Sequence, residues 1–319
     1  MWIGMLTRDV EDGGTHSSIV LTLGIDGVDH LNHTFANTDQ KDQERGQANV
    51  YEVDLRGTNI EARALTDSSI RIGIRGDDAW RPEHLVMWGQ RRGRPGRFDA
   101  EIIPLAIETD ITKVLSTDSS EGPISLPLRL VSHGGSGTVI RRLLMLMVTQ
   151  GTADDDSIFT DPNPVFGTEN SLEIQMVSPS GLVALFEIAN TTQDDLDSGV
   201  ANLYTAPVIV PFAKRDLDED ALTLRIKGTD DWWPASFFLF GLDAPNGRPS
   251  ALVPLSHLPQ WPFGVMRADA TTGAASVTLP LLRGNDVTTD DDVLVAMLRS
   301  IESNQNKVIR LLEQLVKRV

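Results

Sequence analysis

Aspartates on glycine-containing turns are the residues of this chain whose type and spacing best suit a chemical role. Asp9 and Asp12 lie in a glycine loop near the N-terminus, and Asp77 and Asp78 follow Gly76. Calcium prefers six to eight oxygen ligands, which clustered carboxylates supply when two loops share one end of a domain. The pattern therefore indicates a calcium site. The alternative interpretation is solvated turn residues, a common place for aspartate.

The second half of the chain carries corresponding acidic turns. They contain Asp154, Asp155, Asp156, Asp161, Asp230 and Asp231. If the first set binds calcium, we expect this second set to form an equivalent site.

Tryptophans adjoin the acidic turns in both halves. Trp80, Trp232 and Trp233 are candidates for insertion into a membrane surface or a protein interface, because indole is both apolar and a hydrogen-bond donor. The alternative is that they fill the end of a core. Both halves retain the first tryptophan, which favours the core interpretation.

Catalytic chemistry is poorly represented. The chain has no cysteine, which excludes disulfides and thiolate metal sites, and its six histidines lack metal-ligand spacing. The segment His133–Gly137 has no nucleophile elbow beside it. We therefore expect a protein that is not an enzyme.

The acidic turns at Gly76 and Gly228 lie inside a sequence segment that occurs twice in the chain. Ile70, Ile72 and Ile74 alternate with polar or small residues, as in a half-buried strand, before the turn and a second apolar run. The segment 69–89 recurs at 222–241, with Gly76 and Gly228 separated by 152 positions. A period this long indicates a duplicated domain, since solenoid repeats are about 20 to 50 residues long.

Short strands punctuated by Gly, Pro, Asn and Asp predict an all-β protein made of antiparallel sandwiches. We predict a first β-sandwich over 1–132, a Gly-rich linker over 133–138 and a second β-sandwich over 139–284. A C-terminal amphipathic α-helix is predicted over 285–319.

The helix prediction depends on apolar residues at spacings of three and four, after a capping hydroxyl and a run of acids. The apolar positions are Leu294, Met297, Leu298, Ile301, Val308, Leu311, Leu312 and Leu315. An exposed stripe of this kind must meet another surface. We favour docking with sister chains or protein partners, with Asn304 setting the register of a coiled coil. The alternative is that the helix folds back onto a sandwich.

The net charge of the chain limits the kinds of molecule that it can bind. The net charge of −17 opposes nucleic-acid binding, because no basic stripe is present to contact phosphates. No signal peptide and no transmembrane segment are evident, so we expect a protein that is cytoplasmic or part of an assembled particle. Membrane contact, if there is any, is then peripheral.

Three blocks in the first half resemble the PLAT domain, also called the lipoxygenase-homology or LH2 domain. They are 9–23, 44–53 and 69–82, which match in order a Gly-Thr loop, an Arg-Gly before a strand and an Ile-Arg-Ile strand leading to a Trp-containing turn. The second half resembles the same pattern more weakly, because Ser198 replaces the arginine and the first loop is longer.

The resemblance implies a tandem pair of eight-stranded sandwiches that bind other molecules, typically lipid surfaces or protein partners and sometimes through calcium. His16 and Glu169 stand where that family has a calcium-binding acid. Two hypotheses follow. The chain is a non-catalytic binding and assembly protein for lipid or protein recognition, or it is a structural subunit of a larger particle such as a virus, shell or injection machine, without lipid binding.

Overall fold

The computed structural model describes residues 1–35, 43–58, 60–91, 100–151, 167–189, 196–267, 275–282 and 287–288. The described residues are all-β, apart from the short 3-10 helices η1 (Ala62–Ala64) and η2 (Lys214–Asp216). The calcium candidates Asp154, Asp155 and Asp156 lie outside the described residues, and so does Asp161.

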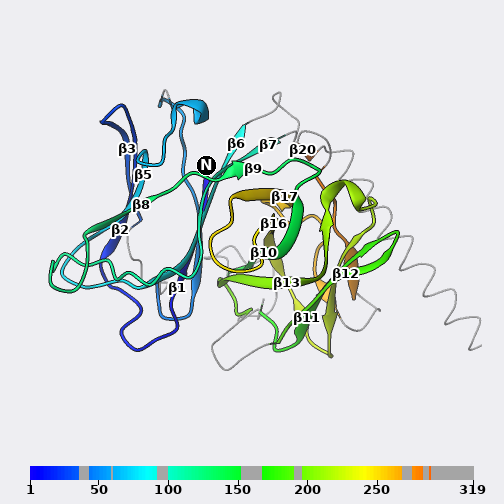
Figure 1. The fold of residues 1–319 in the computed structure, drawn as a ribbon. Coiled ribbons are helices and arrows are strands. Elements are labelled where there is room, and N and C mark those ends of the chain that lie inside the picture. Colours follow the sequence, from blue (N-terminus) through cyan, green and yellow to red (C-terminus); the bar gives the residue numbers. More distant parts are fainter. Residues whose placement is uncertain are drawn as a thin grey trace, which may run out of the picture.

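Sandwich one forms the half of the molecule that contains the N-terminus (Figure 1). One sheet places β7 (Ala100–Glu108), β6 (Pro82–Arg91), β1 (Trp2–Thr7) and β4 (Ala48–Glu52) side by side. The other contains β3 (Val28–Phe35), β2 (Ser18–Ile25), β5 (Ile70–Arg75) and β8 (Ser125–Leu128). The expected alternation is present, since Ile70 and Ile72 are buried and Arg71 between them is half-buried.

Sandwich two repeats this arrangement. One sheet contains β13 (Ala201–Ala213), β10 (Val139–Thr149), β16 (Pro234–Leu242) and β17 (Ala251–Leu258). The other contains β12 (Gly181–Ile188), β11 (Ser171–Ser178), β14 (Leu222–Lys227) and β19 (Ser276–Thr278). A small ribbon of β15 (Asp231–Trp232) and β18 (Met266–Arg267) lies beside the second acidic turn.

The inner sheets of the two sandwiches join into one ten-stranded sheet. The join is the pairing of β4 with β13 at Ala48 and Ala201, which are equivalent positions of the repeat. Equivalent residues facing each other are the mark of two-fold symmetry. The duplicated units therefore contact each other as the subunits of a symmetric dimer do.

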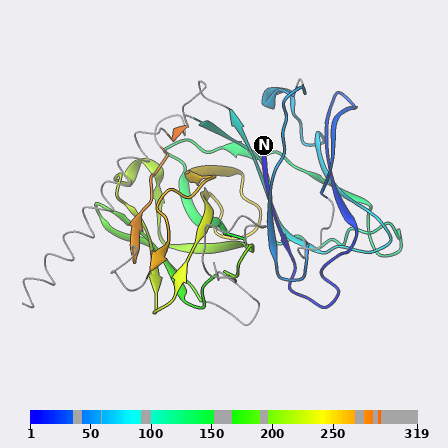
Figure 2. The same cartoon turned by 180° about the vertical axis from the view of Figure 1, so that it is seen from behind.

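Each sandwich has its own hydrophobic core, and a third core lies between the two halves of the ten-stranded sheet. The central aromatic cluster consists of Trp2, Trp88, Phe238, Phe240 and His257, with Trp2 stacked on Trp88 at 6.3 Å between ring centroids. Close approach here is required at Gly4, where a Cβ would lie 2.8 Å from Leu146 Cδ2. The two sandwiches, each of two sheets, lie side by side (Figures 1 and 2) and share this apolar core.

The predicted linker 133–138 is held by hydrogen bonds on both sides. Its first residue belongs to β9 (Ser132–His133), which pairs in parallel with β17. Gly134 N–H donates to Leu252 O at 2.9 Å, and Arg215 N–H donates to Ser136 O at 2.9 Å. The segment is therefore fixed against sandwich two.

The C-terminal prediction needs one correction. Val287 and Thr288, placed in the helical segment by sequence, form β20 (Val287–Thr288) and pair with β7. An edge of the ten-stranded sheet offers them backbone partners, which outweighs the local helix-start signal. The apolar positions from Leu294 to Leu315 lie outside the described residues, so that part of the helix stays a prediction.

Candidate functional site

The acidic turns have the same hydrogen bonds in both sandwiches. Asp78 Oδ2 accepts from His16 N–H at 2.9 Å and its Oδ1 accepts from Ala79 N–H at 2.8 Å. Asp230 Oδ2 accepts from Glu169 N–H at 3.1 Å and its Oδ1 accepts from Asp231 N–H at 2.9 Å. The two carboxylates therefore fix their loops by satisfying backbone donors.

The other described aspartates of these turns do not converge. Asp9 pairs with Arg45 at 2.7 Å, and Asp231 pairs with Arg267 at 2.8 Å. Asp12 has a positive φ of 55°, and Asp77 is exposed. In the described parts of the chain, no group of three or more acidic or histidine side chains is placed to hold a metal.

Electrostatics at the first turn agrees with this structural role. Partial burial opposes ionisation of Asp78, but the N–H groups of His16 and Ala79 outweigh it and lower the pKa of that carboxyl below its ordinary value. Calcium binding stays a prediction.

Trp80 and Trp232 fill the two cores at this end. Both are 0% exposed. Trp80 Nε1 donates to Thr7 Oγ1 at 2.9 Å, and Trp232 Nε1 donates to Thr149 Oγ1 at 3.0 Å. Neither indole is available to a membrane or partner in this structure, so the core interpretation holds for both. Trp233, the residue after Trp232, is half-buried.

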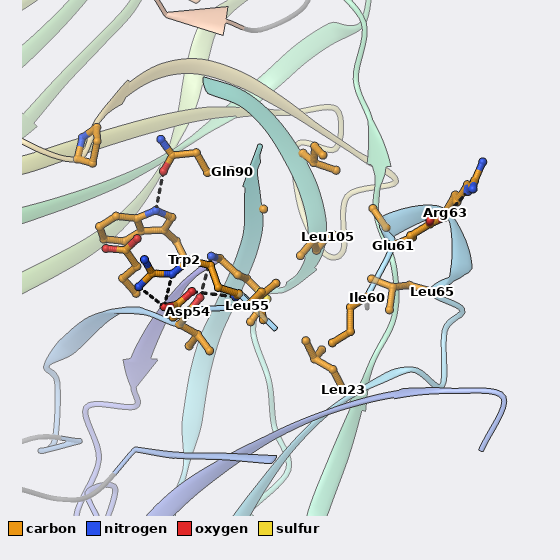
Figure 3. A pocket seen from close by; sticks show the side chains of 18 of the residues that line it. Trp2, Leu23, Asp54, Leu55, Ile60, Glu61, Arg63, Leu65, Gln90 and Leu105 are labelled. Carbon is orange, nitrogen blue, oxygen red and sulfur yellow. Dashed lines mark hydrogen bonds and ion pairs between the residues drawn. The ribbon is translucent and has the colours of Figure 1, made fainter. Parts of the chain in front are cut away.

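The opposite end of sandwich one contains a cavity of about 920 Å³ (Figure 3). It opens between the two sheets, where β1 begins and β2 and β4 end, and Pro259 and Gln260 of sandwich two complete its wall. We call it the sandwich-one cavity. Sequence reasoning missed it, because its lining comes from separate segments of the chain that only the fold brings together.

The floor of the cavity is apolar and its rim is polar. The floor is formed mainly by Leu23, Val53, Leu55, Ile60, Leu65, Ile103 and Leu105. On one side Trp2 Nε1 donates to Gln90 Oε1 at 3.1 Å, which fixes the indole against the wall. An apolar floor below a polar rim suits a ligand that has one apolar and one polar part.

Four of the five charged rim residues form two ion pairs, and the fifth is Glu52. Arg56 lies 2.5 Å from Asp54, and Arg63 lies 2.6 Å from Glu61. Both pairs are exposed, so each contributes little to stability. The rim therefore presents two neutralised pairs and the carboxylate of Glu52 to an entering molecule.

The equivalent end of sandwich two is filled by its own chain. β13 continues to Ala213 and pairs there with the start of β10, at Val139 with Ala213 and at Ile140 with Phe212. Phe212 and Ile140 are both buried in the core of sandwich two. In sandwich one the corresponding segment leaves β4 and turns at Arg56 and Gly57.

A matched pair of glycines shows the difference at atomic scale. Gly89 lines the sandwich-one cavity, and the nearest atom to a Cβ built there is Ile103 Cβ at 3.7 Å. At its counterpart Gly241, a Cβ would lie 2.5 Å from Ile140 Cδ1. The space that is open at Gly89 is occupied at Gly241.

One further property bears on membranes. Within the described ranges, none of the helices has the length and apolar character needed to cross a bilayer.

Few known proteins are similar to this chain. No protein-family model matches the chain, and no curated protein matches it. Among solved structures, the chain is similar to the alpha toxin from Clostridium absonum, with a TM-score of 0.28 and 13% identity over 38% of this chain and 31% of that chain. The matched region spans about a third of the toxin, and a similarity this low supports no argument. The PLAT resemblance therefore stays a prediction, beside the observed all-β architecture.

Proposed function

We propose that this chain is a non-catalytic binding protein that holds the apolar part of an amphipathic ligand in the sandwich-one cavity. The observation that carries the proposal is the contrast between the two ends: Ile140 and Phe212 fill one, and no described residue fills the other. Sandwich one therefore has a space large enough for a ligand at an end that is filled in sandwich two. Its volume lies within the range of about 300 to 1,000 Å³ usual for ligand pockets.

The lining indicates the chemistry of the ligand. Leu23, Ile60 and Ile103 favour an aliphatic group, because apolar surface gains free energy on leaving water. Asp54 and Glu61 pair with the two rim arginines and Glu52 adds a further carboxylate, so the rim, like the net charge of −17, disfavours anionic heads. We therefore favour a neutral or zwitterionic head carrying an aliphatic chain, as in a lipid or a lipid-like monomer.

The test fills the cavity without disturbing the fold. At Gly89, which lines the cavity, an added Cβ meets only ordinary van der Waals contacts, so Gly89→Leu should stay folded and lose affinity at least tenfold for a fluorescent neutral amphiphile. Gly135→Leu is the matched control, because Gly135 is exposed and has no neighbour within 4 Å of its added Cβ.

The outcomes separate the alternatives. Equal binding by wild type and Gly89→Leu would place the ligand elsewhere and contradict the proposal. No binding of neutral amphiphiles, with Gly89-dependent capture of an apolar peptide, would assign the cavity to a protein partner. Flotation with liposomes, with and without calcium, tests the membrane form of the proposal. The role as a structural subunit stays a prediction, and mass photometry of the full chain tests it.

A further inference from the structure

Exposed aliphatic side chains lie on the hairpin of β11 and β12 and on the neighbouring strand β13 of sandwich two. We define the apolar patch as Val177, Leu182, Leu185, Ile209 and Val210, whose exposed fractions are 39%, 38%, 46%, 55% and 51%. Val177 lies opposite Leu182 in the hairpin of β11 and β12. A cluster of exposed aliphatic side chains of this kind usually marks a contact surface.

Two of the matched positions of sandwich one are polar and hydrogen-bonded. Leu182 corresponds to Asp29, which accepts from Arg71 Nη2 at 2.7 Å. Leu185 corresponds to Asn32, whose Oδ1 accepts from Thr22 Oγ1 at 2.9 Å. The same backbone therefore presents a solvated face in one copy and an apolar face in the other.

The end of the described chain lies near this patch. β20 pairs with β7 at Glu101, β7 lies beside β9, and the segment after β9 accepts a hydrogen bond from Arg215 N–H at Ser136 O. Lys214 follows directly on β13, the strand that carries Ile209 and Val210. Figure 1 shows β20 and β9 close together at this side of sandwich two.

We propose that residues 289–319 of the same chain dock on the apolar patch through the stripe that contains Leu294, Leu298 and Ile301. These 31 residues follow β20, and in helical form they would reach about 46 Å at 1.5 Å per residue. That length is ample for a surface at the same end of the molecule. The proposal is independent of the sandwich-one cavity.

The same chain is a better occupant than a sister chain for two physical reasons. A tethered segment meets its site at an effective concentration in the millimolar range. Two copies with a net charge of −17 each repel one another before contact. Docking in cis covers both apolar surfaces without that repulsion.

The first test measures amide hydrogen exchange in the full chain. The double variant Leu182→Asp, Leu185→Asn installs the residues of sandwich one on the face of sandwich two. It should raise the exchange rate of peptides from 289–319 at least tenfold and leave the exchange of β10 and β16 unchanged. Val28→Asp is the control, because Val28 is 59% exposed on sandwich one and its loss should change nothing.

A second measurement distinguishes the occupant. The chain has no cysteine, so Leu185→Cys with Leu298→Cys allows one designed crosslink with a short bis-maleimide. We expect a monomeric crosslinked product whose yield is constant over a 100-fold range of protein concentration. A dimeric product that increases with concentration would assign the patch to a sister chain and overturn the proposal. Unprotected exchange of 289–319 in the wild type would overturn it as well.

Discussion

The two sandwiches agree at one end and differ at the other. At the acidic turns, Asp78 and Asp230 accept the same backbone hydrogen bonds, and Trp80 and Trp232 donate to equivalent threonines. At the opposite end, sandwich two closes on Ile140 and Phe212, whereas sandwich one opens into a cavity. The agreement identifies the turns as part of the scaffold, and the difference identifies the place where the copies can act differently.

The inner faces differ as well. Ile107 and His257 occupy matched positions, opposite Val86 and Phe238 respectively. Both are buried, but only His257 introduces a titratable group into the central aromatic cluster. Sandwich two thus has a polar ring at a position that sandwich one fills with an aliphatic side chain.

The largest effect tests the shared end. Trp80→Ala and Trp232→Ala should each lower the free energy of unfolding by about 3–5 kcal/mol, because each leaves a cavity and an unpaired threonine hydroxyl. We expect the two losses to agree within about 1 kcal/mol in urea unfolding followed by circular dichroism. A loss at one tryptophan alone would show that the ends are not equivalent.

This shared end is the part that the sequence predicts best. The repeat of Gly76, Asp78 and Trp80 at Gly228, Asp230 and Trp232 is local in sequence, and local turn chemistry determines it. The strands around it follow from alternation, as at Ile70 and Ile72. Both signals depend on neighbouring residues, so they can be read without the fold.

The cavity and the joined sheet depend on long-range contacts. Ala48 and Ala201 carry no sequence signal for pairing with each other. Gly89 and Gly241 occupy the same position of the repeat, and only the fold shows that Ile140 packs over Gly241. One signal was available for the central core: Leu143–Val148 is continuously apolar, as expected for a strand buried on both faces. It indicates a buried strand but does not identify what covers it.

The next prediction concerns Ile140, which fills the end of sandwich two that corresponds to the sandwich-one cavity. Ile140→Ala should destabilise the protein by about 2–4 kcal/mol, because truncation leaves a void above Gly241. The void left by three carbon atoms is far smaller than the sandwich-one cavity, so the binding stoichiometry of the fluorescent amphiphile should not change. Ile140→Val, with an expected loss of about 0.5–1.5 kcal/mol, is the control. A second bound amphiphile in Ile140→Ala would show that this end opens much further than the truncation alone allows.

The third prediction concerns pH and the mismatch at His257. Burial among Trp2, Trp88 and Phe238 lowers the pKa of His257 from 6.5 to about 3. The unfolded chain therefore binds a proton that the folded chain excludes, and stability falls as pH drops from 6.5 towards 3. The loss approaches about 1.4 kcal/mol per pH unit in this window.

His257→Ile installs the residue type of sandwich one and removes this contribution. Urea unfolding at pH 7 and pH 5 should show a smaller pH effect in the variant than in the wild type. The variant should also be no less stable at pH 7, because no described residue accepts a hydrogen bond from His257 Nε2 or donates one to it. An equal pH effect in both proteins would assign the acid sensitivity to the carboxylates.

The smallest expected effect returns to the acidic turns. Asp78→Ala and Asp230→Ala each remove two acceptors of backbone N–H groups, and each should cost about 1–2 kcal/mol, since solvent can replace part of the lost bonding. The two sites lie in different sandwiches, so the double variant should show additive losses. Calcium should not alter these differences if the carboxylates serve only the loops. A calcium-dependent gain in the wild type that both variants lose would instead assign them to a metal site, and would make the shared end functional as well as structural.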